Sequence, residues 1–114
     1  MHLKNFSMLR NEEGTWNLSP AYDLVPVRIL MPSDREELAL TLNGKKANLR
    51  RADFEHLATS LGLSATQSHR AIARMCKAFQ SNLDEAIDTS FLSKGFQTRF
   101  RELAMARLSV FNVE

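Results

Sequence analysis

The chain has 114 residues and a net charge of +2, with 15 basic residues against 13 acidic ones. This length predicts one domain, and acidic neighbours of the arginines argue against direct nucleic-acid binding. The single cysteine excludes an internal disulfide, and no apolar run approaches the roughly 20 residues that span a bilayer. Without a visible signal peptide or membrane segment, we expect a cytoplasmic protein.

The first third of the chain predicts two short hairpins separated by a loop. Residues 6–9 and 15–18 carry alternating apolar side chains around a turn that contains Gly14. Prolines at positions 20, 26 and 32 predict an irregular segment over residues 19–33. The pair Asn43-Gly44 is typical of a type I′ turn and predicts a second hairpin over residues 38–49.

The remaining residues predict three helices. The first covers about residues 51–61 and is closed by Gly62. The second begins with the capping-box pair Ser64 and Gln67 and runs to about residue 88, and Ser93 is the expected N-cap of the third. We expect the apolar stripes to form one core, with these members: Cys76 as a buried thiol, Phe79 and Phe100 near the centre, and Phe111 at the end of the third helix.

The predicted fold class is therefore mainly α (α+β), with two short β-hairpins followed by a three-helix bundle. We expect one domain over residues 1–114, made of a hairpin region over 1–50 and a helical part over 51–114. Exposed apolar residues of the first region predict a patch that favours self-association, including a homodimer: Trp16, Tyr22, Val25, Val27, Ile29 and Leu30.

Asn5 and Asp23 are the candidate metal ligands. Magnesium prefers oxygen ligands, and a kinase grips its metals with one Asn and one Asp on either side of the nucleotide phosphates. A hairpin between the two residues would bring them together. Lys4 could offer a positive charge to phosphate, and His2 could hold the shape of the loop. The alternative is structural, with Asn5 satisfying a turn and Asp23 capping one beside Tyr22.

The segments 1–7 (MHLKNFS) and 18–26 (LSPAYDLVP) closely resemble the HipA family of bacterial serine/threonine kinases, the toxins of toxin–antitoxin pairs. The family pattern is Asp, any residue, His, any residue, Lys, Asn, Phe and Ser, followed later by a loop with Pro, Tyr-Asp and Leu. The resemblance implies Mg and ATP as cofactors, Asn5 and Asp23 as metal ligands, Lys4 and Asp23 as cofactor-binding residues, and His2 and Lys4 as catalytic-loop positions. It extends to residues 43–46 and 90–92, and so over most of the chain.

The departures from this pattern are equally specific. The catalytic Asp of the family would precede Met1, and the four glycines lie too far apart to form a phosphate-covering loop. We therefore expect a truncated, C-terminal fragment of a HipA-like kinase that is inactive alone and binds neither Mg nor ATP tightly. Its expected partners are the N-terminal remainder of the kinase or a DNA-binding antitoxin, with a protein substrate in the complete kinase. The alternative is a non-catalytic interaction module that pairs with such a partner.

Overall fold

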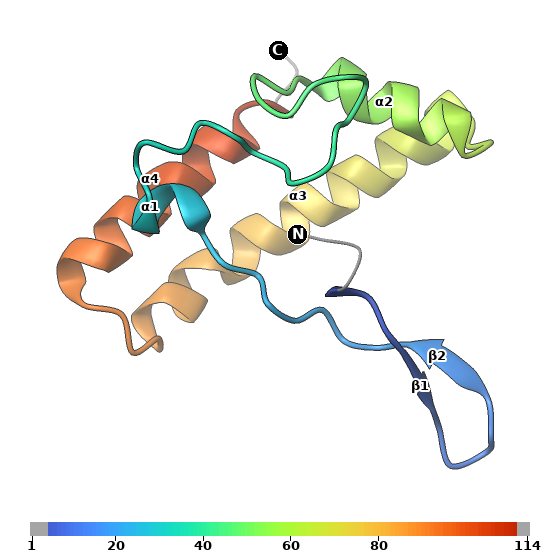
Figure 1. Cartoon of the computed structure of the whole chain (residues 1–114), viewed down its shortest axis with the longest axis horizontal. Helices are drawn as coiled ribbons and strands as arrows, with labels where there is room; N and C mark the ends of the chain where they lie inside the picture. The colour runs from blue at the N-terminus through green and yellow to red at the C-terminus, as the bar shows by residue number, and fades with distance from the viewer. Residues whose placement is uncertain (1–4, 112–114) are drawn as a thin grey trace.

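The computed structural model describes residues 5–111. Six elements follow one another along the chain (Figure 1): β1 (Met8–Arg10), β2 (Trp16–Leu18), α1 (Val27–Leu30), α2 (Arg51–Ser60), α3 (Ala65–Asp88) and α4 (Lys94–Leu108). This order confirms the mainly α (α+β) class. Within the described residues, no helix is long and apolar enough to cross a membrane.

The first predicted hairpin is present. Strands β1 and β2 pair antiparallel with Leu9 opposite Asn17. The connecting turn is held by the Asn11 side chain, whose Oδ1 accepts a hydrogen bond from the Thr15 N–H at 2.8 Å, and Gly14 takes a φ of 82° that favours glycine. Figure 1 shows the hairpin projecting away from the helices, and neither strand packs against a described helix.

The second predicted hairpin is wrong beyond its turn. Asn43 and Gly44 both have positive φ values, 51° and 73°, as a type I′ turn requires. Only the isolated bridge between Leu42 and Lys45 accompanies the turn among the described residues 31–50. The flanking backbone bonds elsewhere, because the Glu37 and Leu38 N–H groups share the Lys46 carbonyl and do not form a ladder.

The predicted irregular segment over residues 19–33 contains the short helix α1. Pro26 precedes it, and its carbonyl accepts hydrogen bonds from the N–H groups of Ile29 and Leu30. Proline tolerates the start of a helix because its missing N–H would have no partner there. The turn buries Ile29, so this residue does not belong to the exposed patch that the sequence predicts, whereas Trp16, Tyr22, Val25, Val27 and Leu30 are exposed.

The three longer helices match the sequence prediction closely. Ser64 and Gln67 form the capping box of α3, with the Ser64 N–H donating to Gln67 Oε1 at 2.8 Å. Gly62 has a φ of 79°, consistent with its place after α2. The last helix ends at Leu108, so Phe111 lies in the turn beyond it and contacts Phe54 edge to face, with ring centroids 4.9 Å apart.

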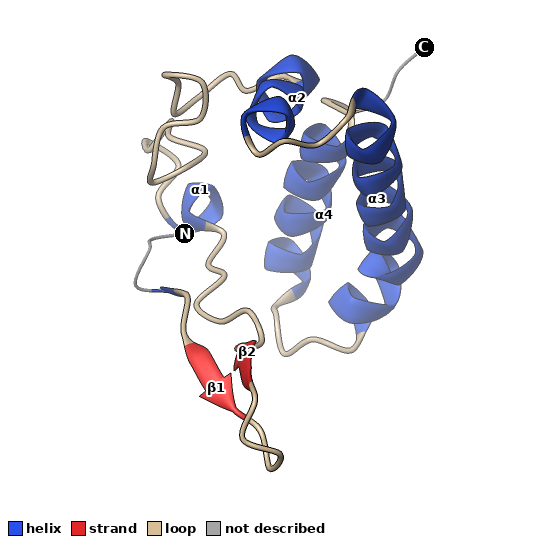
Figure 2. Cartoon of the chain, turned by 90° about the vertical axis from the view of Figure 1, so that its right-hand side faces the viewer, coloured by secondary structure: helices blue, strands red, loops and turns tan. Residues whose placement is uncertain are grey.

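The core lies between α3 and α4, which lie side by side in Figure 2. Leu83, Ile87 and Ala104 form its buried centre, with Phe100 packed against them. Gln97 is also buried there and donates from Nε2 to the Ile87 carbonyl at 3.1 Å. The second half of α3 is therefore covered by α4, and α2 packs on α3 as well.

Two predicted core residues in the middle of α3, Cys76 and Phe79, lie outside this buried centre. Phe79 is 45% exposed and Cys76 is only half-buried, because α2 and α4 face this part of the helix without closing over it. Together with Phe54, Ile72 and Met75 they line an apolar hollow of about 320 Å³ between α2, α3 and α4.

A buried carboxylate joins the turn at residues 43–45 to the start of α2. Asp53 is 2% exposed, although its sequence neighbours suggest a solvated charged face. Its Oδ1 accepts hydrogen bonds from Lys45 Nζ at 2.9 Å and Asn43 Nδ2 at 2.8 Å, and its Oδ2 accepts from the Arg50 N–H at 2.8 Å. These donors, Lys45 first, hold the pKa of Asp53 far below its usual range.

The unequal burial along α3 predicts unequal costs of truncation. Ile87→Ala should lower the free energy of unfolding by roughly 2–5 kcal/mol, because it leaves a cavity in the α3–α4 core. Phe79→Ala should cost less than about 2 kcal/mol, because much of the ring already contacts solvent. Urea unfolding measures both, and a Phe79 variant as destabilised as the Ile87 variant would contradict the exposed hollow.

The Asp53 network predicts a specific loss of stability in acid. Because folding lowers this pKa, the carboxylate contributes its full stabilisation above its unfolded pKa of about 3.9 and loses it as the pH falls below that value. The melting temperature of the wild type should therefore fall as the pH is lowered below about 4. Asp53→Asn should be less stable at pH 7, and its melting temperature should change less with pH in acid. Glu102→Gln removes an exposed carboxylate of α4 and serves as the control; an identical acid profile in both variants would overturn the assignment.

Candidate functional site

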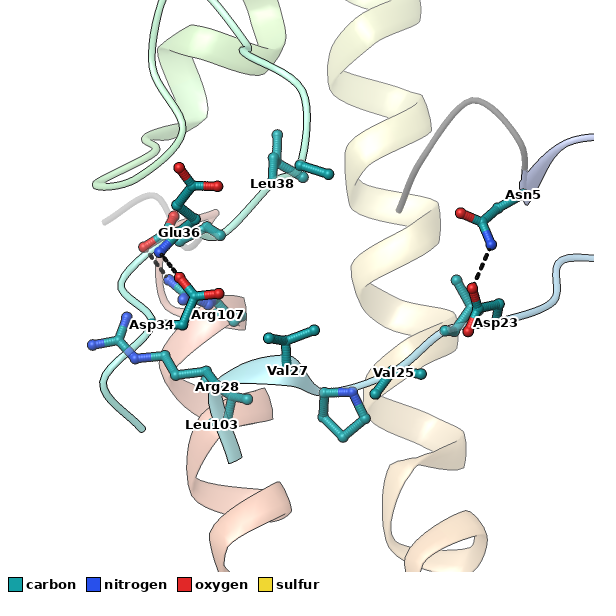
Figure 3. Close-up of a pocket in the computed structure, with 14 residues that line it drawn as sticks. Asn5, Asp23, Val25, Val27, Arg28, Asp34, Glu36, Leu38, Leu103 and Arg107 are labelled. Atoms are coloured by element: carbon teal, nitrogen blue, oxygen red, sulfur yellow. Dashed lines mark hydrogen bonds and ion pairs between the residues drawn. The ribbon is translucent and has the colours of Figure 1, made fainter. Parts of the chain in front are cut away.

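The hairpin brings Asn5 and Asp23 together at its open end. Beyond the last strand pair, the Ser19 N–H donates to the Ser7 carbonyl at 2.8 Å, and the two serine hydroxyls lie 3.0 Å apart. These contacts continue the pairing of β1 and β2 toward the helices. As a result, Asn5 Nδ2 donates to Asp23 Oδ2 at 2.7 Å (Figure 3).

The backbone of Asp23 has an uncommon conformation. Its φ of 55° lies in the left-handed region, which Asp and Asn tolerate better than other residues with a side chain. Such a conformation persists where surrounding contacts hold it, and here the hydrogen bond to the buried Asn5 is one of them. The carboxylate is thus held against the amide.

The donor set of this pair fits a hard cation. A carboxylate and an amide supply the oxygen atoms that Mg²⁺ prefers, and Mg²⁺ commonly takes only one or two protein ligands and completes its shell with water and phosphate oxygens. Within residues 5–111, no group of three or more His, Cys, Asp or Glu side chains is placed to hold a metal. The pair therefore fits a phosphate-bound Mg²⁺ better than an all-protein cage.

The structure thus brings together the two predicted metal ligands. The other two predicted site residues, His2 and Lys4, lie outside the described residues. Their predicted roles in the catalytic loop, and that of Lys4 in cofactor binding, stay predictions.

A groove of about 680 Å³ extends from the Asn5–Asp23 pair toward α4 (Figure 3). One side is formed by residues 24–28, which lead into α1, and the other by residues 34–39, with α4 behind them. The lining side chains from these parts include Val25, Val27, Arg28, Asp34, Glu36, Glu37, Leu38, Leu103 and Arg107. The groove is thus built by parts of the chain that are far apart in sequence.

An ion pair between Glu37 and Arg107 joins the segment 34–39 to α4. Arg107, on α4, donates to Glu37 Oε1, and the Leu49 N–H donates to Glu37 Oε2 at 3.2 Å. Burial alone would raise the pKa of Glu37, but the hydrogen bonds from Arg107 and Leu49 and the Arg107 charge outweigh it and lower this pKa. The carboxylate is therefore ionised and held in the wall of the groove.

Sequence reasoning does not identify this pair. The two residues are separated by 70 positions, and each has the residue type of an ordinary surface charge. The only local signal is that Arg107 falls on the apolar stripe of its helix, where a charged residue needs a partner.

The comparisons with known proteins agree with the resemblance seen in the sequence. The family model described as the HipA-like C-terminal domain matches residues 1–83, which include the hairpin, the Asn5–Asp23 pair and the groove segments up to α3. Comparison with curated proteins gives no match. Because the match covers most of the chain, we conclude that the chain belongs to the HipA-like C-terminal domain family.

Proposed function

We propose that Asn5 and Asp23 hold a magnesium ion for phosphoryl transfer from ATP to a protein serine or threonine, in a complete HipA-like kinase. The observation that carries the proposal is the 2.7 Å contact between the amide and the carboxylate, set up by the hairpin. Membership of the family supports it, because the matched residues 1–83 include both positions, to which the resemblance of the sequence assigns the metal ligands.

Each residue has a distinct part in this proposal. The Asp23 carboxylate would supply the charged metal ligand and Asn5 the neutral oxygen, while Lys4 would face phosphate and His2 would hold the loop. The metal ion supplies charge neutralisation on the transferred phosphate when bound. The transfer itself is proposed for the complete kinase, because the family pattern places the catalytic Asp before His2. The complete kinase would act in the cytoplasm, where a bacterial cell holds its ATP.

The exposed hairpin favours a second function, docking of a partner protein. Trp16 and Leu18 are 62% and 63% exposed, and β1 carries the exposed apolar residues Met8 and Leu9. An isolated two-stranded hairpin is marginally stable in water, so burial of its exposed apolar side chains against a partner would stabilise it. The partner we propose is the N-terminal remainder of the kinase, with a DNA-binding antitoxin or a second copy of the chain as alternatives.

The metal proposal predicts a weak but local response to divalent ions. Titration of the ¹⁵N-labelled chain with Mn²⁺ should broaden the signals of Asn5 and Asp23 first, with a dissociation constant in the millimolar range, about −4 kcal/mol, because two protein ligands alone bind weakly. Asp23→Asn should abolish the response. In the complete kinase, the same change should lower phosphoryl transfer about 100-fold or more.

The control for this experiment separates metal binding from folding. Asp23→Asn keeps an oxygen acceptor for Asn5 and a residue type that tolerates positive φ, so its free energy of unfolding should stay near that of the wild type. Asp23→Ala loses both and should cost roughly 1–2 kcal/mol. An unchanged Mn²⁺ response in folded Asp23→Asn, or full kinase activity in it, would refute the metal assignment.

The docking proposal predicts that hairpin and metal variants behave differently. Trp16→Ser should weaken association of the chain with the N-terminal remainder of the kinase about tenfold, because it removes a large apolar contact. Asp23→Asn should leave that association unchanged. Calorimetric titration of the two purified pieces measures both, and equal affinity of wild type and Trp16→Ser would exclude the hairpin as the contact.

A further inference from the structure

The groove continues well beyond the proposed metal ligands, and its lining is acidic. Four carboxylates face two guanidinium groups in it: Asp23, Asp34, Glu36 and Glu37 against Arg28 and Arg107. Lys46, outside the lining, bonds Glu36 at 3.1 Å, so one negative charge is left in excess. A nucleotide polyphosphate carries several negative charges, and this lining offers it no net positive charge. A metal ion at Asn5 and Asp23 can hold phosphate at one end of the groove, but the rest of the lining suits a neutral or basic occupant.

The two sides of the groove also offer backbone and apolar contacts of the kind that an extended polypeptide uses. Leu24, Val25 and Val27 are exposed apolar residues on one side, with Leu38 and Ala39 on the other. Among the described residues, no acceptor is bonded to the N–H groups of Leu24, Val25 and Ala39. Free backbone donors beside shallow apolar contacts are what strand-like peptide binding requires.

The wall at residues 34–39 is fixed by side-chain bonds, since it has no regular secondary structure. Glu37 is the central link, because it bonds Arg107 of α4 on one side and the Leu49 N–H on the other. Its side chain is only 12% exposed, against 37% for that of Arg107, so the carboxylate end of this link is shielded from competing water. Removing the guanidinium would release the wall from α4.

We propose that the groove between residues 24–28 and 34–39 binds the acceptor polypeptide in an extended conformation, with Glu37 and Arg107 as positioning residues. Its acidic lining favours an acceptor that carries Arg or Lys beside the serine or threonine. This inference rests on the proposed function, because it assigns the protein substrate to the part of the site that the metal and phosphate leave open.

The test uses the ¹⁵N-labelled 114-residue chain and a synthetic peptide, Ala-Arg-Ala-Ser-Ala-Arg-Ala. Adding the peptide should shift the amide signals of residues 24–28 and 34–39, whereas ATP should leave the signals of 34–39 in place. A matched peptide with glutamate in place of both arginines should bind about tenfold more weakly. Shifts of 34–39 caused by ATP, or equal binding of the two peptides, would overturn the proposal.

Two variants test the positioning role. Arg107→Met keeps the length of the side chain but loses the bond to Glu37, and it should weaken peptide binding about tenfold, while Arg107→Lys restores most of it. Arg101→Met is the control, because Arg101 also lies on α4 but bonds Asp84 of α3 outside the groove. Peptide binding by Arg107→Met equal to that of the wild type would refute the role.

The outcomes stay separable from those of the metal proposal. The Mn²⁺ response of Asn5 should persist in Arg107→Met. Asp23→Asn should lose the Mn²⁺ response, but the peptide should still shift the amide signals of residues 34–39 in this variant. Should Arg107→Met lose its dispersed amide spectrum, the comparison of the two peptides and ATP on the wild type decides the question alone.

Discussion

Two carboxylates, Glu37 and Asp53, hold residues 31–50 against the helices, and the shape of the site depends on them. This segment has no strand or helix among the described residues, so its backbone lacks the regular ladder that usually satisfies polar groups. Asp53 collects three donors around the turn, and Glu37 bonds α4 and the Leu49 N–H. A carboxylate can accept several hydrogen bonds at once, so one such residue can hold several parts of an irregular segment in place.

The fold was predictable wherever neighbouring residues decide the structure. The helices followed from apolar spacing and from local signals such as the Ser64–Gln67 capping box, and the turn at Asn43-Gly44 followed from its need for positive φ. The second hairpin was predicted wrongly, because a turn signal says nothing of the groups that compete for the flanking backbone. The burial of Asp53 was missed for the same reason, since its partner Lys45 lies before the helix in a separate segment.

The same distinction explains what could be foreseen of the site. Asn5 and Asp23 lie at the two ends of one hairpin, so the expectation that they meet needed only a turn and two short strands. The far wall of the groove depends on an ion pair across 70 positions, for which no periodicity or motif gives a signal. The end of the groove at Asn5 and Asp23 could therefore be predicted from the sequence, whereas the rest depends on the packing of distant parts such as α1 and α4.

The proposed metal site and the exposed apolar hairpin lie on different parts of the molecule. Several charged groups of the groove, among them Asp23, Glu37 and Arg107, are already bonded within the chain, and such bonds keep them in place. The hairpin and the hollow beside Phe79 are apolar and uncovered, and their burial would release water from large side chains. Because the hairpin leads directly into Asp23, a protein that covers the strands would also steady the proposed metal ligand. Docking and catalysis would then be coupled through the base of the hairpin, at the contact between Ser7 and Ser19.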